Sequence, residues 1–187
     1  MQSKYNNRKE AYEKKQWAFV SDYARLDVVN EEGGIYLDCD VEIIRDISPL
    51  LDNFFFAGFE DSNYIALGLA FGSVAGHPYL NELIRYYDGL DFINENGEYN
   101  LIPCPVYQTR IMRKFGLNCF NSFQKLENIT IYPSDFFAPV SMWGKGNISE
   151  NTFSIHHYSA SWQTNNEKGI KDAICKRYYD RLISNTH

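Results

Sequence analysis

The chain has 187 residues, of which 44% are apolar and 22% charged, and its formal net charge is -6. This length and composition indicate one folded domain and exclude a mainly disordered chain. The acidic balance argues against a general nucleic-acid binder, which would present a basic surface. No apolar run approaches the ~20 residues that a membrane helix needs, and the charged first 15 residues do not look like a secretory signal. We therefore expect no transmembrane segment and a cytoplasmic location.

The four cysteines, Cys39, Cys104, Cys119 and Cys175, form no C-x-x-C pair and match no zinc-binding spacing. Their scattered positions are typical of free thiols in a reducing compartment.

Hydrophobic periodicity and turn residues predict an alternation of helices and strands. In the first half, in chain order, these are a helix at 4–18, a helix that begins at Ser21 and ends at the glycines 33–34, strands at 35–37 and 41–44, a short helix at 46–51, and strands at 54–59 and 64–71. The second half predicts helices at 78–87 and 106–115, strands at 129–132 and 152–158, and a helix at 168–183. Such alternation indicates an α/β layered domain.

Asp38 and Asp40 stand at the carboxyl end of the strand predicted at 35–37. In an extended chain, side chains two residues apart point to the same side, here toward the crevice where α/β sheets bind ligands. Two carboxylates suit Mg²⁺ or Mn²⁺, and such an ion bridges carboxylates to a diphosphate. The alternative is a pair of solvated aspartates in a turn.

Asp22 and Arg25 lie one helix upstream and are i, i+3 neighbours on one helix face. Taken alone, they would be a local ion pair of small energetic worth. Together with the aspartate pair, however, the chain reads S-D-x-x-R, then seven residues, then G-G-I-Y-L-D-x-D. A string of this length and composition is specific.

This string resembles the DXD sugar-binding region of glycosyltransferase family 32. That family includes bacterial capsular-polysaccharide enzymes and fungal mannosyltransferases, and the large bacterial glucosylating toxins share its core. Two later segments are similar to the capsular members in the same order, I-Y-P-S-D-F-F-A-P at 131–139 and I-H-H-Y-S-A-S-W at 155–162. The resemblance implies a single GT-A-like domain over 1–187, with 163–187 as a C-terminal helix or tail.

The resemblance also implies a retaining glycosyltransferase. Its donor would be a nucleotide-sugar, with a UDP-sugar as the first expectation, and its cofactor Mn²⁺ or Mg²⁺. Its acceptor would be a saccharide in capsular or surface polysaccharide synthesis, which would place the protein in the cytoplasm or peripherally at the inner membrane.

Carried over by position, Asp40 would bind the metal. Asp38 would contact the ribose or sugar of the donor, or reach the metal through water. Asp22 and Arg25 would hold hydroxyl groups of the donor sugar, and Tyr36 would line the nucleotide side. Four of these, Asp22, Arg25, Asp38 and Asp40, are the expected catalytic residues.

The closing segment supplies the remaining expected site residues. Ser161 and Trp162 would close over the diphosphate of the donor. His156 and His157 face opposite sides if the segment is a strand, so at most one of them points at the metal. We favour His156 as the metal ligand, because related closing segments align their histidine there. The alternative is one structural and one solvated histidine.

The chain departs from the family pattern at its start. Family members begin with a strand of the I-P-K-I-I-H type, whereas nothing before Ser21 is typical of a strand. We therefore expect a sheet without its first strands, a nucleotide pocket without one wall, and self-association through the exposed sheet edge. Two other functions stay open: a truncated, non-catalytic remnant that binds a partner or donor weakly, and a metal-dependent hydrolase.

Overall fold

The computed structural model describes residues 12, 17–90, 93, 96–97, 99–100 and 102–158. The chain forms two units, Met1–His157 and Tyr158–His187, and apart from Tyr158 the described residues all belong to the first. Three expectations fall outside the described residues: the helix at 168–183, most of the helix at 4–18, and the closing of Ser161 and Trp162 over the donor.

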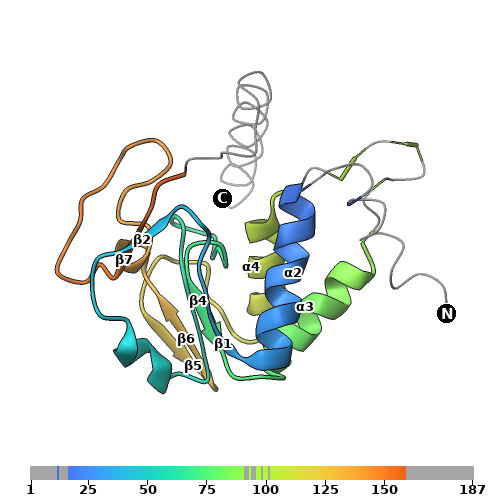
Figure 1. Cartoon of the computed structure of the whole chain (residues 1–187), viewed down its shortest axis with the longest axis horizontal. Coiled ribbons are helices and arrows are strands. Elements are labelled where there is room, and N and C mark those ends of the chain that lie inside the picture. The colour runs from blue at the N-terminus through green and yellow to red at the C-terminus, as the bar shows by residue number, and fades with distance from the viewer. Residues whose placement is uncertain are drawn as a thin grey trace. The chain divides into compact units, whose positions relative to one another are not determined.

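The main sheet has five short strands (Figure 1). In spatial order they are β1 (Gly34–Tyr36), β4 (Phe71–Ser73), β3 (Phe55–Gly58), β6 (Ile129–Tyr132) and β5 (Gln124–Leu126). Strands β3 and β6 are parallel, while the other neighbouring pairs are antiparallel. Because β4 is antiparallel to both of its neighbours, β1 runs in the same direction as β3. The carboxyl ends of β1, β3 and β6 therefore lie along one edge of the sheet.

Three helices pack beside this sheet: α2 (Trp17–Glu32), α3 (Pro78–Asp88) and α4 (Cys104–Arg113). The core between helices and sheet is rich in aromatic rings. Phe55 of β3 meets the ring of Tyr79 of α3 edge-on at 4.9 Å between centroids, and both side chains are fully buried. Edge-on aromatic contacts of this kind stabilise a core beyond the area they bury.

A separate two-stranded sheet joins β2 (Val41–Ile43) to β7 (Ser154–His156), with Val41 opposite His156. Short 3₁₀ helices, η1 (Ser48–Asp52) and η2 (Ser134–Phe136), follow β2 and β6 along the chain. The β2–β7 pairing matters for function because it brings a segment more than 100 residues downstream next to the turn that carries Asp38 and Asp40.

Most predicted elements are confirmed. They include the strands expected at 35–37, 41–44, 54–59, 129–132 and 152–158 and the helices expected at 46–51, 78–87 and 106–115, with ends that differ by a few residues. The mixed α/β arrangement is compatible with a GT-A-like fold. No described helix is both long enough and apolar enough to cross a bilayer.

Two predicted elements are wrong. Ser21 does not start a helix, because α2 already begins at Trp17. Within α2, the Ser21 carbonyl accepts a hydrogen bond from Arg25 Nε at 3.3 Å. The stretch 64–71 is not one strand, and only its last residue, Phe71, belongs to β4. The backbone N–H groups of Ile65 and Leu67 donate to side chains of α4 instead of to a neighbouring strand.

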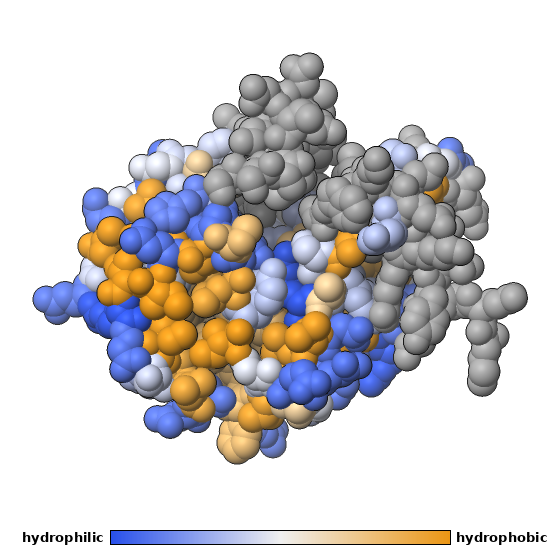
Figure 2. Space-filling model, in the orientation of Figure 1, coloured by the Kyte–Doolittle hydropathy of each residue, from blue (hydrophilic) through white to orange (hydrophobic). Residues whose placement is uncertain are grey.

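The sheet also carries exposed apolar side chains. Figure 2 shows hydrophobic atoms gathered over the strands on the side away from α2 and α3. The Val74 N–H donates to the Phe54 carbonyl at 2.8 Å, and both side chains are largely exposed. Phe54 and Val74 adjoin the inner strands β3 and β4, and apolar surface of this kind is where chains can associate. Self-association through an edge strand of the sheet stays a prediction.

His77 is 4% exposed and caps α3, because its Nδ1 accepts a hydrogen bond from the Tyr79 N–H. Burial lowers the pKa of His77 below its ordinary value. The unfolded chain therefore binds a proton more readily, and the free energy of unfolding should fall as the pH drops below about 6.5.

We predict that His77→Asn, which keeps a capping side chain, shows a smaller loss of stability between about pH 7.5 and 5.5 than the wild type. Urea unfolding at the two pH values measures the loss. The same loss in both proteins would show that His77 does not carry the pH dependence.

Candidate functional site

The site is built on the turn that follows β1. Strand β1 ends at Tyr36, and the chain turns at residues 39–40 before β2 begins at Val41. The Asp38 N–H donates to the Gly68 carbonyl and the Val41 N–H donates to the Asp38 carbonyl, both at 3.1 Å. The carboxylates of Asp38 and Asp40 thus come together through a turn, rather than through the strand alternation that the sequence suggested.

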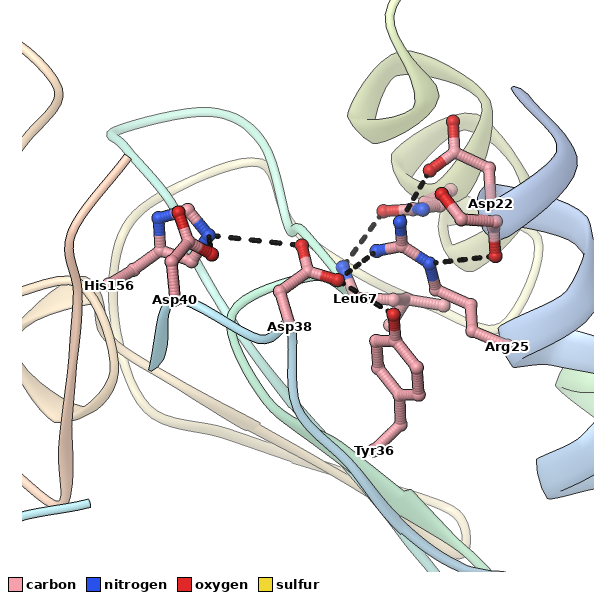
Figure 3. Close-up of polar contacts among 9 residues, drawn as sticks. Asp22, Arg25, Tyr36, Asp38, Asp40, Leu67 and His156 are labelled. Atoms are coloured by element: carbon pink, nitrogen blue, oxygen red, sulfur yellow. Dashed lines mark hydrogen bonds and ion pairs between the residues drawn. The ribbon is translucent and has the colours of Figure 1, made fainter. Parts of the chain in front are cut away.

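His156 completes a cluster with this aspartate pair (Figure 3). Its Nε2 lies 3.4 Å from Asp40 Oδ1 and 3.8 Å from Asp38 Oδ2. One potential ligand atom from each of the three residues lies within 4.8 Å of the others, and the side chains are only 11–26% exposed. His157 points elsewhere, with Nε2 at 3.0 Å from Glu42 Oε2 on the exposed side.

The donor set of this cluster fits a divalent cation. Two carboxylates and a neutral imidazole together are typical ligands of Mn²⁺, and the carboxylates alone suit Mg²⁺. Three protein ligands leave further coordination positions for the oxygens of a bound substrate.

A buried arginine links the cluster to helix α2 (Figure 3). Arg25 is 7% exposed, and its guanidinium contacts Asp22 Oδ1 at 2.7 Å and Asp38 Oδ1 at 3.3 Å. The same guanidinium lies over the ring of Tyr36, 5.0 Å from the centroid. The Tyr36 hydroxyl donates to Asp38 Oδ1 at 2.8 Å. One oxygen of Asp38 is thus held by Arg25 and Tyr36, while Oδ2 is directed toward His156.

The charges of this group are mutually stabilised. Burial alone would raise the pKa of Asp38, but its contacts with His156, Arg25 and Tyr36 hold it below the ordinary value. Burial would lower the pKa of Arg25, yet the nearby carboxylates raise it. Burial raises the pKa of Tyr36, and the negative charge of Asp38 raises it further, whereas the positive charge of Arg25 opposes the shift. Asp38 and Arg25 therefore stay charged and Tyr36 stays a neutral donor near neutral pH.

The described cysteines, Cys39, Cys104 and Cys119, are free thiols, while Cys175 lies outside the described residues. Burial and the charge of Asp22 raise the pKa of Cys104 well above its ordinary value. A thiol in that state is a poor nucleophile, so Cys104 is a packing residue at the start of α4 rather than a reactive group.

The sequence reading missed Gly68, which lies directly against the site. A Cβ at this position would come within 2.5 Å of Asp38 Oδ2 and 2.8 Å of Arg25 Nη1. Glycine lets the backbone approach both side chains closely. Gly68 stands alone among apolar residues in a stretch predicted as a strand. Such a glycine often marks a place where the backbone closely approaches another group, so it could have pointed to this contact.

The comparisons with known proteins agree with the chemistry of this group. Residues 1–56, which contain Asp22, Arg25, Asp38 and Asp40, match a family model described as "Glycosyltransferase sugar-binding region containing DXD motif". The chain is 27% identical over 180 residues to the human protein "Alpha-1,4-N-acetylglucosaminyltransferase". That alignment covers 87% of the chain and 48% of the relative, so the chain spans about half the relative's length. No solved structure matches the chain. Both matches indicate similarity to glycosyltransferases.

The close approach at Gly68 leads to a prediction. Gly68→Ala should lower the free energy of unfolding by roughly 1–3 kcal/mol, because the added methyl group overlaps Asp38 and Arg25. Gly89→Ala is the matched control, since a Cβ there meets nothing closer than 3.6 Å. Denaturant unfolding measures both variants, and an equal effect in the two would contradict the packing described for Gly68.

Proposed function

We propose that this chain carries the donor-binding part of a metal-dependent, retaining glycosyltransferase that transfers a sugar from a nucleotide-diphosphate donor to a saccharide acceptor. The observation that carries the proposal is the convergence of Asp38, Asp40 and His156 beside the ion pair between Asp22 and the buried Arg25. A UDP-sugar donor and a role in capsular or surface polysaccharide synthesis are part of the proposal. They follow from the sequence resemblance.

Asp40, Asp38 and His156 would hold the Mn²⁺ or Mg²⁺ ion. When bound, the ion neutralises the negative charge that develops on the leaving diphosphate, an effect worth several kcal/mol. The protein's own task is to keep Asp38 ionised and in place. Arg25 and Tyr36 do this by contacting Asp38 Oδ1, which leaves Oδ2 directed toward His156.

Asp22 and Arg25 would bind hydroxyl groups of the donor sugar. Sugar hydroxyls both donate and accept hydrogen bonds, and this pair offers a carboxylate acceptor next to guanidinium donors. The pair is pre-organised, since Arg25 Nε is held by the Ser21 carbonyl while Nη2 is held by Asp22. A pair that is already held in place loses little conformational entropy when the sugar binds.

Two parts of the proposal rest on the resemblance. Ser161 and Trp162 would close over the diphosphate, and the leaving diphosphate would itself take the proton of the acceptor hydroxyl. For that reason no protein base is assigned.

The metal site can be tested by substitution. Asp40→Asn should abolish metal-dependent sugar transfer, since the amide has no negative charge with which to hold the cation. The fold should survive, so the thermal unfolding midpoint measured without metal should stay near the wild-type value. Asp52→Asn changes an exposed aspartate in η1 and is the control. If Asp40→Asn transferred sugar with the same dependence on metal concentration as the wild type, the assignment of Asp40 as a metal ligand would be contradicted.

Calorimetry separates the enzyme from a non-catalytic remnant. Titration of UDP into the protein with Mn²⁺ should release heat of binding, and EDTA should abolish it because the diphosphate is bound through the cation. Absence of heat together with absence of a thermal shift would favour the remnant. Release of free sugar that does not depend on an acceptor would instead favour a hydrolase.

A further inference from the structure

The carboxyl edge of the sheet continues beyond the metal cluster. In α/β sheets ligands bind outside the carboxyl ends of the strands. After β1 this edge carries Asp38 and Asp40, after β3 it carries the acidic turn that starts at Glu60, and after β6 it carries Ser134. With neighbouring strands about 4.8 Å apart, the β3 turn lies roughly 10 Å along the edge from the end of β1.

Glu60 acts electrostatically on the same buried thiol as Asp22, one of the two residues proposed to bind the donor sugar. The charges of Asp22 and Glu60 both act on the thiol of Cys104, at the first residue of α4. The neighbouring carboxylate, Asp61, has a structural role, since its Oδ1 accepts the N–H groups of Asn63 and Tyr64 and thereby closes the turn. Glu60 is half-buried at the start of this turn.

The loop before β5 is fastened to this edge. Asn121 donates its N–H to the Ser62 carbonyl at 3.1 Å, and its side chain exchanges two hydrogen bonds of 2.8 Å with Ser134. The Gln124 amide donates to the carbonyls of Asn118 and Phe120 and accepts the Asn118 N–H. The loop is therefore rigid and bridges the turns that follow β3 and β6.

This rigid loop holds Phe120 out into solvent. At 71% exposure, Phe120 is the most exposed large hydrophobic side chain among the described residues. Three residues further along the loop, the ring of Phe123 packs edge-on against Tyr132, with 5.6 Å between the ring centroids. This aromatic face is open to water at the edge of the sheet where α/β folds bind ligands, so it is available to a ligand bound there.

The chemistry around Phe120 favours a saccharide over a protein partner. Besides Cys119 and Phe123, the loop and the adjoining turns carry amide and hydroxyl side chains, namely Asn118, Asn121, Ser122, Ser62 and Ser134. Weakly positive C–H groups of a pyranose ring pack on the negative face of an aromatic ring, while its hydroxyls need neutral donors and acceptors. A protein interface would instead need a contiguous apolar centre.

We propose that Phe120 and Glu60 form the acceptor side of the site. The Phe120 ring packs on a pyranose ring of the acceptor, and the Glu60 carboxylate accepts a hydrogen bond from one of its hydroxyls. The proposal rests on the proposed function, because it places a saccharide acceptor next to the donor residues along the same sheet edge. It assigns no proton transfer to Glu60.

Saturation-transfer NMR tests the proposal without any donor. The probes are methyl glycosides of hexoses, N-acetylhexosamines and hexuronic acids, offered as a panel to the whole protein. We expect saturation of pyranose C–H protons by the wild type for at least one glycoside, and an affinity about tenfold lower for Phe120→Ala. Glu60→Gln should also weaken binding of the same glycoside, since the neutral amide is the poorer acceptor.

Phe54→Ala is the matched control, because Phe54 is 60% exposed but precedes β3 at the opposite, amino edge of the sheet. It should bind the glycoside as the wild type does. Saturation of no glycoside by the wild type, or equal binding by Phe120→Ala and the wild type, would overturn the proposal. Calorimetry with UDP and Mn²⁺ on Phe120→Ala should match the wild type. Loss of the UDP signal in the wild type would count against the proposed function alone.

Discussion

The site depends on the ion pairs made by the buried guanidinium of Arg25. This guanidinium joins helix α2 to the turn after β1 by contacting Asp22 on its own helix and Asp38 across from it, with the Tyr36 ring beneath. A charge with this little exposure is stable only when its partners are also in place. Conversely, without Arg25 the two carboxylates would repel each other and lose the geometry that aims Asp38 toward His156.

The topology of the sheet determines which segments lie beside Asp22, Arg25 and Asp38. Strands β1, β3 and β6 run in one direction, so the segments that follow them share an edge. The pairing of β2 with β7 then adds His156 from the far end of the described chain. The three side chains of the proposed metal site come from two distant segments, and their assembly requires both the main sheet and the β2–β7 sheet.

Residues close together in the sequence were predictable. The S-D-x-x-R and G-G-I-Y-L-D-x-D string placed Asp22, Arg25, Asp38 and Asp40 in one region because the segments are short and contiguous. Strand alternation indicated that only one of the two histidines faces the aspartates, and the structure places His156 there. Helix α3 was predictable because Pro78 opens it.

Features decided by contacts between distant segments were not predictable. The 64–71 stretch has the composition of a strand, yet Thr109 and Gln108 of α4 accept the Ile65 and Leu67 N–H groups and hold it as a turn. The same loop presses Gly68 against Asp38 and Arg25. Ser21 looked like a cap, but α2 begins at Trp17, so Ser21 lies inside the helix. In the 64–71 stretch, contacts with a distant helix override the local signal.

We propose that Asp38, Asp40 and His156 bind one divalent cation beside the residues expected to bind the donor sugar. Anomalous diffraction from crystals grown with Mn²⁺ and UDP is the decisive test. We expect one strong anomalous peak within coordination distance of all three side chains, about 2.0–2.3 Å from their ligand atoms. Bound UDP with no anomalous peak at these residues, or a manganese peak elsewhere in the chain, would contradict it.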